Sequence, residues 1–297
     1  MTSTFKRIGV MSRHRTPGAA QTLSHLKSYL QGRHLTVLLE SESVKDIDAQ
    51  GLTIVPREKL GETCDLVIVV GGDGSLLNAA HAVVNQSVPV LGINRGRLGF
   101  LTDIDPQQLE EKLSAVLDGQ YFEEERFLIH AEIEREGIVE AEGDALNEVV
   151  LYAGDVARMI EFEVYVDNQF VFSQRSDGLI IATPTGSTAY ALSAGGPIIH
   201  PSIPTLTLVP MFPHTLSNRP IVLPGSARIE IIVASTLEIY PGVSCDGQAP
   251  VLLAPGDKIR LYKKDKSLRL IHPMDYNYFH VLRSKLHWGK PLLREER

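Results

Sequence analysis

Cysteine and tryptophan are scarce in this sequence, which has 297 residues but only two cysteines and one tryptophan. Two cysteines are too few for a small scaffold held together by disulfides. A long apolar run and a leader-like N-terminal segment are missing as well. We therefore expect a cytoplasmic protein with reduced thiols and no membrane partner.

An excess of positive charge is also lacking. The chain carries 36 Asp and Glu residues against 29 Lys and Arg residues, which gives a formal net charge of -7. That balance argues against a nucleic-acid partner and leaves room only for a local anion pocket. Hydrophobic residues make up 43% of the chain, which is enough for sizeable cores in two domains.

Short aliphatic runs alternate with helical patterns in the first third of the chain. The runs cover residues 8–11, 37–39, 66–70 and 88–93, and apolar residues at helical spacing fall within 20–30 and 76–84. Asp105 followed by Pro106 is typical of the start of a further helix. These patterns predict an α/β domain with a parallel, Rossmann-like sheet over residues 1–120.

After residue 120 the apolar residues alternate with a period of two, as in residues 127–133, 160–166 and 229–233. Asp167-Asn168 is typical of a hairpin turn. We predict a mainly antiparallel β domain over residues 121–271. Residues 276–288 have a helical pattern, and we expect residues 272–297 to return to the first domain.

The sequence Gly71-Gly72-Asp73-Gly74 follows the aliphatic run 66–70 directly, and Ser75 follows it. Glycines let backbone N–H groups approach phosphate oxygens closely, and the N-terminus of a following helix favours anions. A carboxylate beside phosphates is repulsive unless it holds a metal or accepts a proton. This turn therefore predicts a phosphate site with a catalytic acid, Asp73.

A second glycine-containing segment, 92–99, includes Arg95 and Arg97. The arginines could pair with phosphate, or the segment could be a strand-to-loop crossover with solvated arginines. The sequence gives these alternatives equal weight.

Three further polar segments lie in the second domain. Asn147-Glu148 could bind base nitrogens or sugar hydroxyls, although the dipeptide alone favours an exposed strand start. Residues 183–190 are rich in hydroxyl side chains and predict a turn that could bind an anion or cap a helix. Residues 244–248 predict a hairpin turn from which Gln248 could reach a ligand.

Histidine, cysteine and carboxylate residues show no metal-ligand spacing, so we expect no metal site built from side chains. His272, which precedes Pro273, is expected to be a hydrogen-bond donor in a loop.

Taken in order, these segments resemble the NAD kinase family: residues 71–74, 92–99, 147–148, 176–178, 183–190 and 195–197. The resemblance spans residues 8 to 288 and implies transfer of the terminal phosphoryl group of ATP to the 2′-hydroxyl of the adenosine ribose of NAD. It also implies a divalent cation, Mg²⁺, and a homo-oligomer. The glycine turn alone is shared with lipid and sugar kinases, and a non-catalytic NADP-binding sensor could keep the same pocket.

The resemblance also implies roles for individual residues. Asp73 would accept the proton of the acceptor hydroxyl. Phosphate contacts would come from Gly71, Gly72, Gly74 and Arg95. NAD contacts would come from Asp73, Gly74, Asn147, Glu148, Arg158, Arg175, Asp177, Thr188, Ala189, Tyr190, Ala191, Leu192, Ser193 and Gln248.

Overall fold

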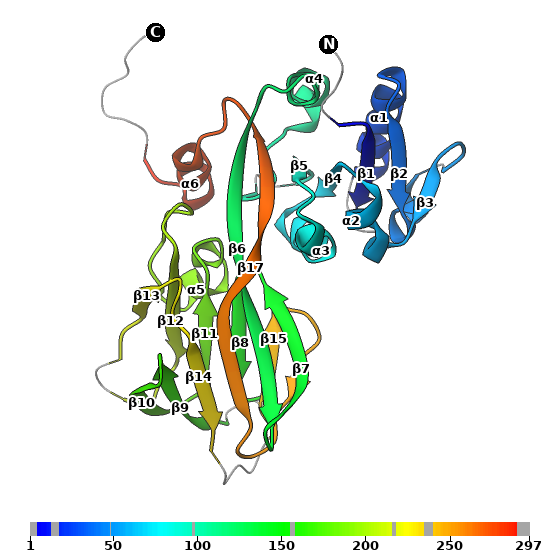
Figure 1. The fold of residues 1–297 in the computed structure, drawn as a ribbon. Helices are drawn as coiled ribbons and strands as arrows, with labels where there is room; N and C mark the ends of the chain where they lie inside the picture. The colour runs from blue at the N-terminus through cyan, green and yellow to red at the C-terminus, as the bar shows by residue number, and fades with distance from the viewer. Residues whose placement is uncertain are drawn as a thin grey trace. The chain divides into compact units, whose positions relative to one another are not determined.

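The computed structural model describes residues 5–12, 18–47, 49–96, 99–154, 158–215, 218–234 and 240–289 (Figure 1). The chain divides into two compact units: unit 1, which comprises Met1–Glu125 and Leu268–Arg297, and unit 2, which comprises Arg126–Ser267. Two strands, β6 (Tyr121–Arg135) and β17 (Lys258–Pro273), contribute residues to both units.

Unit 1 alternates strands and helices. Its elements are β1 (Arg7–Ser12), α1 (Ala19–Gly32), β2 (Thr36–Glu40), η1 (Ser41–Asp46), β3 (Thr53–Val55), η2 (Arg57–Lys59), α2 (Leu60–Thr63), β4 (Leu66–Gly71), α3 (Asp73–Val83), η3 (Val84–Gln86), β5 (Val90–Asn94), η4 (Pro106–Gln108), α4 (Leu109–Leu117) and α6 (Tyr278–Leu286). The strand order is β17-β5-β4-β1-β2-β3, and every neighbouring pair is parallel.

Both faces of the unit 1 sheet are covered. Alternate residues of β1, β2, β4 and β5 share one apolar core with α1 and α4, in which Leu23, Leu26, Leu109 and Leu113 are fully buried. Helix α3 contacts β1, β4 and β5 as well as α2. Burial on both sides explains why these strands are continuous aliphatic runs, each buried side chain contributing about 1.5–3 kcal/mol.

Unit 2 consists mainly of strands. Its elements are β7 (Ile138–Ala145), β8 (Glu148–Tyr152), β9 (Ile160–Val166), β10 (Gln169–Ser176), β11 (Gly178–Ala182), η5 (Gly186–Thr188), α5 (Tyr190–Ser193), β12 (Thr205–Met211), β13 (Ile221–Pro224), β14 (Ile229–Val233), β15 (Gly242–Cys245) and β16 (Val251–Leu252).

The unit 2 strands form two sheets (Figure 1). Side chains of both sheets share one apolar core. One sheet has the order β10-β9-β14-β17, with β6 pairing with β17 and β7, and the other has the order β13-β12-β11-β8-β15-β16. Every strand pair within the second sheet is antiparallel. The core takes alternate residues from both sheets, which accounts for the period of two in the sequence.

The predicted fold class is confirmed: a parallel α/β unit, an antiparallel β unit, and a C-terminal helix, α6, within the α/β unit. Asp105 caps the helical segment as expected, because its carboxylate accepts the N–H of Gln107 at 2.8 Å. The loop expected at His272 is wrong, since this histidine lies inside β17 and is fully buried. No helix among the described residues has the length and apolarity needed to span a bilayer.

Candidate functional site

The glycine turn of unit 1 joins the end of β4 to the start of α3. A Cβ atom on Gly71 would lie 2.4 Å from Oγ of Ser75, so packing within the turn requires glycine there. Gly72 and Gly74 face open space, because a Cβ atom on either would have no described atom within 4 Å. The packing of the described residues therefore does not require these two glycines, although close approach of a ligand would.

The Asp73 carboxylate is held by the segment 99–103, which we call the clamp segment. Its Oδ2 accepts the N–H of Phe100 at 2.9 Å, and its Oδ1 accepts the N–H of Leu101 at 3.0 Å. The hydroxyl of Thr102 lies 3.4 Å from Oδ1. A Cβ on Gly99 would lie 2.1 Å from Oδ1, so glycine at this position makes room for the carboxylate. Asp73 is thus fixed in one orientation.

Gly92 has a packing role of the same kind. A Cβ there would lie 2.8 Å from the carbonyl oxygen of Leu101 and from Cα of Thr102. Both glycines at the ends of segment 92–99 thus allow the clamp segment to pack closely, which supports the crossover interpretation of these glycines. The sequence did not predict the clamp, and its one signal was the position of Gly99.

Arg95 has two separate connections. Its backbone N–H donates to the carbonyl of Gly71 at 2.8 Å, which ties it to the glycine turn. Its Nε lies 2.5 Å from the hydroxyl of Thr22, at the beginning of α1. Arg95 also lines a cavity of about 290 Å³ to which Asp103 and Asp105 contribute. Arg97 lies outside the described residues.

In unit 2, one carboxylate holds the backbone of the Asn147-Glu148 segment. Asp246 accepts three N–H groups, from Leu146 at 2.7 Å, Asn147 at 2.8 Å and Glu148 at 3.1 Å. Asp246 and Gly247 both have positive φ, as in the predicted Asp-Gly hairpin turn. The sequence predicted this turn but missed the role of its carboxylate.

The turn that follows β11 packs against the same segment. The N–H of Thr183 donates to the carbonyl of Asn147 at 2.8 Å, and the Thr183 hydroxyl donates to the carbonyl of Leu146. A Cβ on Gly186 would lie 2.1 Å from the Asn147 carbonyl oxygen. The two segments therefore form one compact structure at this end of the sheet.

Glu148 is buried, with only 8% of its surface exposed, so the exposed strand start considered from the sequence is wrong. Burial, together with the nearby Asp246 carboxylate, raises the pKa of Glu148 to about 8. A hydrogen bond from the Tyr190 N–H acts in the opposite direction and lowers this pKa in part. Its Oε2 has no hydrogen-bond partner among the described residues. A protonated carboxyl in this position can donate a hydrogen bond as well as accept one.

Residues 188–193 comprise the last residue of η5, Ala189 and the short helix α5. Ala191 is buried, whereas Tyr190 is exposed and Ser193 lies on the surface. The Ser187 hydroxyl donates to the Pro184 carbonyl and accepts the N–H of Ile199 at 3.0 Å, so it stabilises the turn itself.

The predicted NAD residues of unit 2 fall into two groups at opposite ends of β11. Glu148 pairs with Ala182, at the end of β11 that leads into residues 188–193. Asp177 directly precedes Gly178, which pairs with Tyr152 at the other end. A strand of five residues spans roughly 17 Å. Arg175 lies beside Asp177, whereas Gln248 follows the Asp246 turn and belongs to the first group.

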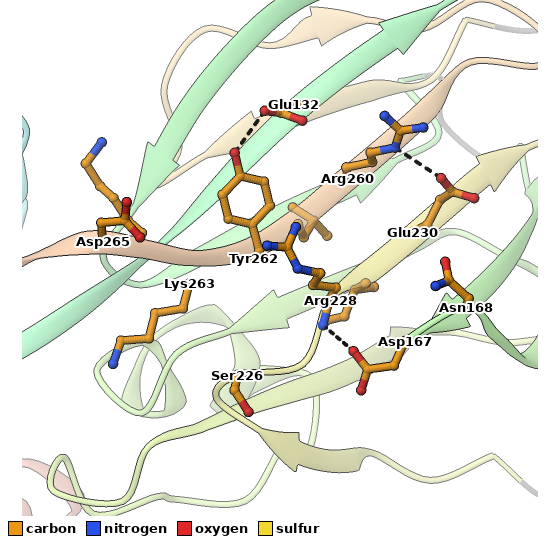
Figure 2. A pocket seen from close by; sticks show the side chains of 13 residues that line it. Glu132, Asp167, Asn168, Ser226, Arg228, Glu230, Arg260, Tyr262, Lys263 and Asp265 are labelled. Carbon is orange, nitrogen blue, oxygen red and sulfur yellow. Dashed lines mark hydrogen bonds and ion pairs between the residues drawn. The ribbon is translucent and has the colours of Figure 1, made fainter. Parts of the chain in front are cut away.

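Unit 2 also carries a cavity of about 990 Å³, shown in Figure 2, that holds no predicted site residue. Tyr262 donates to Glu132 at 2.8 Å, and the guanidinium of Arg228 lies 5.3 Å from the centre of the Tyr262 ring (Figure 2). Arg260 pairs with Glu230 at 3.2 Å. Acidic and basic side chains balance in its lining, which argues against a site for a polyanion such as ATP.

Among the described residues, no group of three or more His, Cys, Asp or Glu side chains is arranged to hold a metal ion. A cation carried by a nucleotide needs few protein ligands, because phosphate oxygens and waters supply most of its coordination.

Two family models match the chain. The model described as the ATP-NAD kinase N-terminal domain covers residues 8–121, and the ATP-NAD kinase C-terminal domain covers residues 146–273. The chain is 56% identical over 288 residues to the NAD kinases of Pseudomonas entomophila (strain L48) and Pseudomonas syringae pv. syringae (strain B728a). Each alignment covers 97% of this chain and 97% of the relative.

Solved structures show the same likeness. An NAD kinase from Archaeoglobus fulgidus in complex with ATP has a TM-score of 0.74 and 28% identity, over 94% of this chain and 99% of that chain. Yeast NADH kinase complexed with NADH has a TM-score of 0.87, over 97% of this chain and 90% of that chain, and at 23% identity it supports the fold alone. From the two family models and the relatives at 56% identity, the chain belongs to the NAD kinase family of phosphotransferases.

Proposed function

We propose that this protein transfers the terminal phosphoryl group of ATP to the 2′-hydroxyl of the adenosine ribose of NAD⁺, forming NADP⁺ and ADP, with Asp73 as proton acceptor. The observation that carries the proposal is the fixed Asp73 carboxylate between two glycines, Gly72 and Gly74, that the described packing does not require. Such a turn suits a reaction in which catalysis consists mostly of positioning.

Asp73 suits the role of base because its carboxylate is oriented yet not saturated. An ionised carboxylate offers about four acceptor positions. The N–H groups of Phe100 and Leu101 and the hydroxyl of Thr102 account for three of them. One position remains for the hydroxyl of the substrate, whose proton leaves as the new bond to phosphorus forms.

The phosphates of ATP would lie at the start of α3, near Gly71, Gly72 and Gly74. The first N–H groups of a helix have no partner within the helix and favour anions. Arg95 would contribute through the guanidinium nitrogens that do not contact Thr22. Mg²⁺ bound to the ATP phosphates would offset their charge.

NAD would contact both groups of residues in unit 2. Near one end of β11, Asn147 and the neutral carboxyl of Glu148 would bind base or ribose atoms, with residues 188–193 and Gln248 beside them. Near the other end, Arg175 and Asp177 would bind a second part of a dinucleotide, as would Arg158, which is exposed.

We also propose that the protein is a homo-oligomer in which neighbouring subunits complete each NAD pocket. The length of β11 between the two groups supports this, since a second copy could bring the distant group to the same ligand. Mixed oligomers test the idea. When Asn147→Ala and Asp177→Ala chains are refolded together, activity should exceed that of either variant alone, and simple averaging of the two activities would contradict it.

The reaction is tested by incubating the protein with ATP, Mg²⁺ and NAD⁺ and reading the product with an NADP-specific dehydrogenase. NADP⁺ formation well above the control without enzyme is expected. Phosphorylation of diacylglycerol or a sugar phosphate without NADP⁺ would instead identify a lipid or sugar kinase. Nucleotide binding without ATP consumption would identify a sensor.

The two free thiols, Cys64 and Cys245, support the proposed cytoplasmic location.

A further inference from the structure

A buried histidine of unit 1 lies between two carboxylates. Nδ1 of His272 is 2.9 Å from Oδ2 of Asp103, and its Nε2 is 3.4 Å from Oε2 of Glu124. The ring stacks on Tyr276, with centres 3.8 Å apart and planes tilted by 15°. His272 is fully buried, so its position is set by packing on every side.

Strand pairing places His272 beside the middle of β5. Leu270 and Ile271 pair in parallel with Val90 and Leu91, the first two residues of β5, so His272 comes next in register, at the level of Gly92. The chain leaves β5 at Asn94 and returns through the clamp segment to Ile104. Asp103 is the last residue of the clamp segment, and it is the one that His272 contacts.

The clamp segment is therefore fixed at both ends. Its near end donates the N–H groups of Phe100 and Leu101 to Asp73, and its far end holds the Asp103 carboxylate against His272. Between them, Nδ2 of Asn94 donates to the carbonyl of Thr102 at 3.2 Å. A displacement of Asp103 would be transmitted within three residues to the groups that orient Asp73.

We propose that His272 is a positioning residue for phosphoryl transfer: through Asp103 it fixes the clamp segment and thereby the orientation of the Asp73 carboxylate. The proposal rests on the proposed role of Asp73. A shift of about 1 Å in a reacting group can lower turnover by about 10²-fold, so a contact remote from the substrates can affect the chemical step.

Two amide variants distinguish the contact of His272 with Asp103 from its contact with Glu124. The amide nitrogen of Asn lies as many bonds from Cβ as Nδ1 of histidine, and that of Gln lies as many bonds away as Nε2. His272→Asn keeps a donor for Asp103, whereas His272→Gln keeps one for Glu124. We expect His272→Gln to lower kcat by roughly 10- to 10²-fold, with KM for ATP and NAD⁺ unchanged. His272→Asn should retain most of the parent kcat.

His130 supplies a matched control. Its Nδ1 lies 2.7 Å from Asp144 and its Nε2 lies 3.5 Å from Glu142, so it repeats the arrangement of His272 between two carboxylates. These two carboxylates and the ring of Tyr262, which His130 also contacts, lie outside the clamp segment. His130→Gln should therefore leave kcat unchanged. An equal loss in His130→Gln and His272→Gln would overturn the proposal.

A double-mutant cycle tests the link to Asp73 directly. In an Asp73→Asn background, His272→Gln should cause no further loss of turnover, because the group that it orients is already gone. Losses that multiply would overturn the positioning role. Near-normal turnover of Asp73→Asn alone would instead refute the proposed base and leave the structural contact intact. Asp103→Asn tests the same contact from the loop side, and unchanged kcat in this variant would also contradict the proposal.

Discussion

Replacing Glu148 by glutamine should make the stability of the protein less dependent on pH. In the folded chain, burial and the Asp246 carboxylate raise the pKa of Glu148 from 4.5 to about 8. The folded state therefore holds this proton more tightly than the unfolded state does. The resulting stability is fully present below pH 4.5 and is lost as the pH rises through about 8.

The size of the effect follows from the two pKa values. Each pH unit between them corresponds to about 1.4 kcal/mol, so ionising Glu148 in the folded chain costs at most about 5 kcal/mol. Glutamine has nearly the same shape and does not titrate. The free energy of unfolding of Glu148→Gln, relative to the parent protein, should therefore rise by about 4 kcal/mol between pH 5 and pH 9.

Urea unfolding followed by far-UV circular dichroism at pH 5, 7 and 9 would measure this difference. Glu140→Gln, which removes an exposed carboxyl of β7, is the matched control. Its free energy of unfolding relative to the parent should not change between pH 5 and pH 9. If the free energy of unfolding of Glu148→Gln relative to the parent were also constant over this pH range, the assigned burial and charge environment of Glu148 would be refuted.

Outcomes for four further variants follow from the site. Gly99→Ala should lower turnover by roughly 10²-fold or more, because its Cβ would lie 2.1 Å from Oδ1 of Asp73. Gly72→Ala should keep the melting temperature, because its Cβ would face open space, but should raise the KM for ATP. Steady-state kinetics and calorimetry on both variants would check these outcomes. Asp246→Ala removes the acceptor of three backbone N–H groups and should destabilise unit 2 by about 2–5 kcal/mol in urea unfolding. Asp177→Ala should raise the KM for NAD⁺ more than that for ATP, and equal changes would indicate a general folding defect.

The strands and helices of unit 1 could be predicted because their signals are local. Runs such as 66–70 are buried on both faces, so their side chains alone indicate a strand of a parallel sheet. The period of two in unit 2 predicted antiparallel strands for the same reason, since its two sheets bury alternate residues. Asp105 capped a helix as expected, because a cap depends on the next few residues.

The environment of the site could not be predicted, because it depends on contacts between distant residues. Asp246 lies about a hundred positions from the N–H groups that it accepts, and His272 lies 169 positions from Asp103. Glu148 looked like an exposed strand start because its burial comes from residues that follow it by many positions. The sequence left segment 92–99 open between arginines that pair with phosphate and a strand-to-loop crossover, whereas the packing role of Gly92 and Gly99 is explained only by the folded clamp segment.

The most direct test of the account is the turnover of Asp73→Asn. Asparagine keeps one acceptor oxygen for the clamp segment but cannot take up the proton of the acceptor hydroxyl. With ATP, Mg²⁺ and NAD⁺ at saturating concentrations, NADP⁺ formation should fall by roughly 10²- to 10⁴-fold, while KM for both substrates changes little. Turnover close to that of the parent protein, measured in a variant with an unchanged circular dichroism spectrum, would contradict the assignment of Asp73 as the proton acceptor.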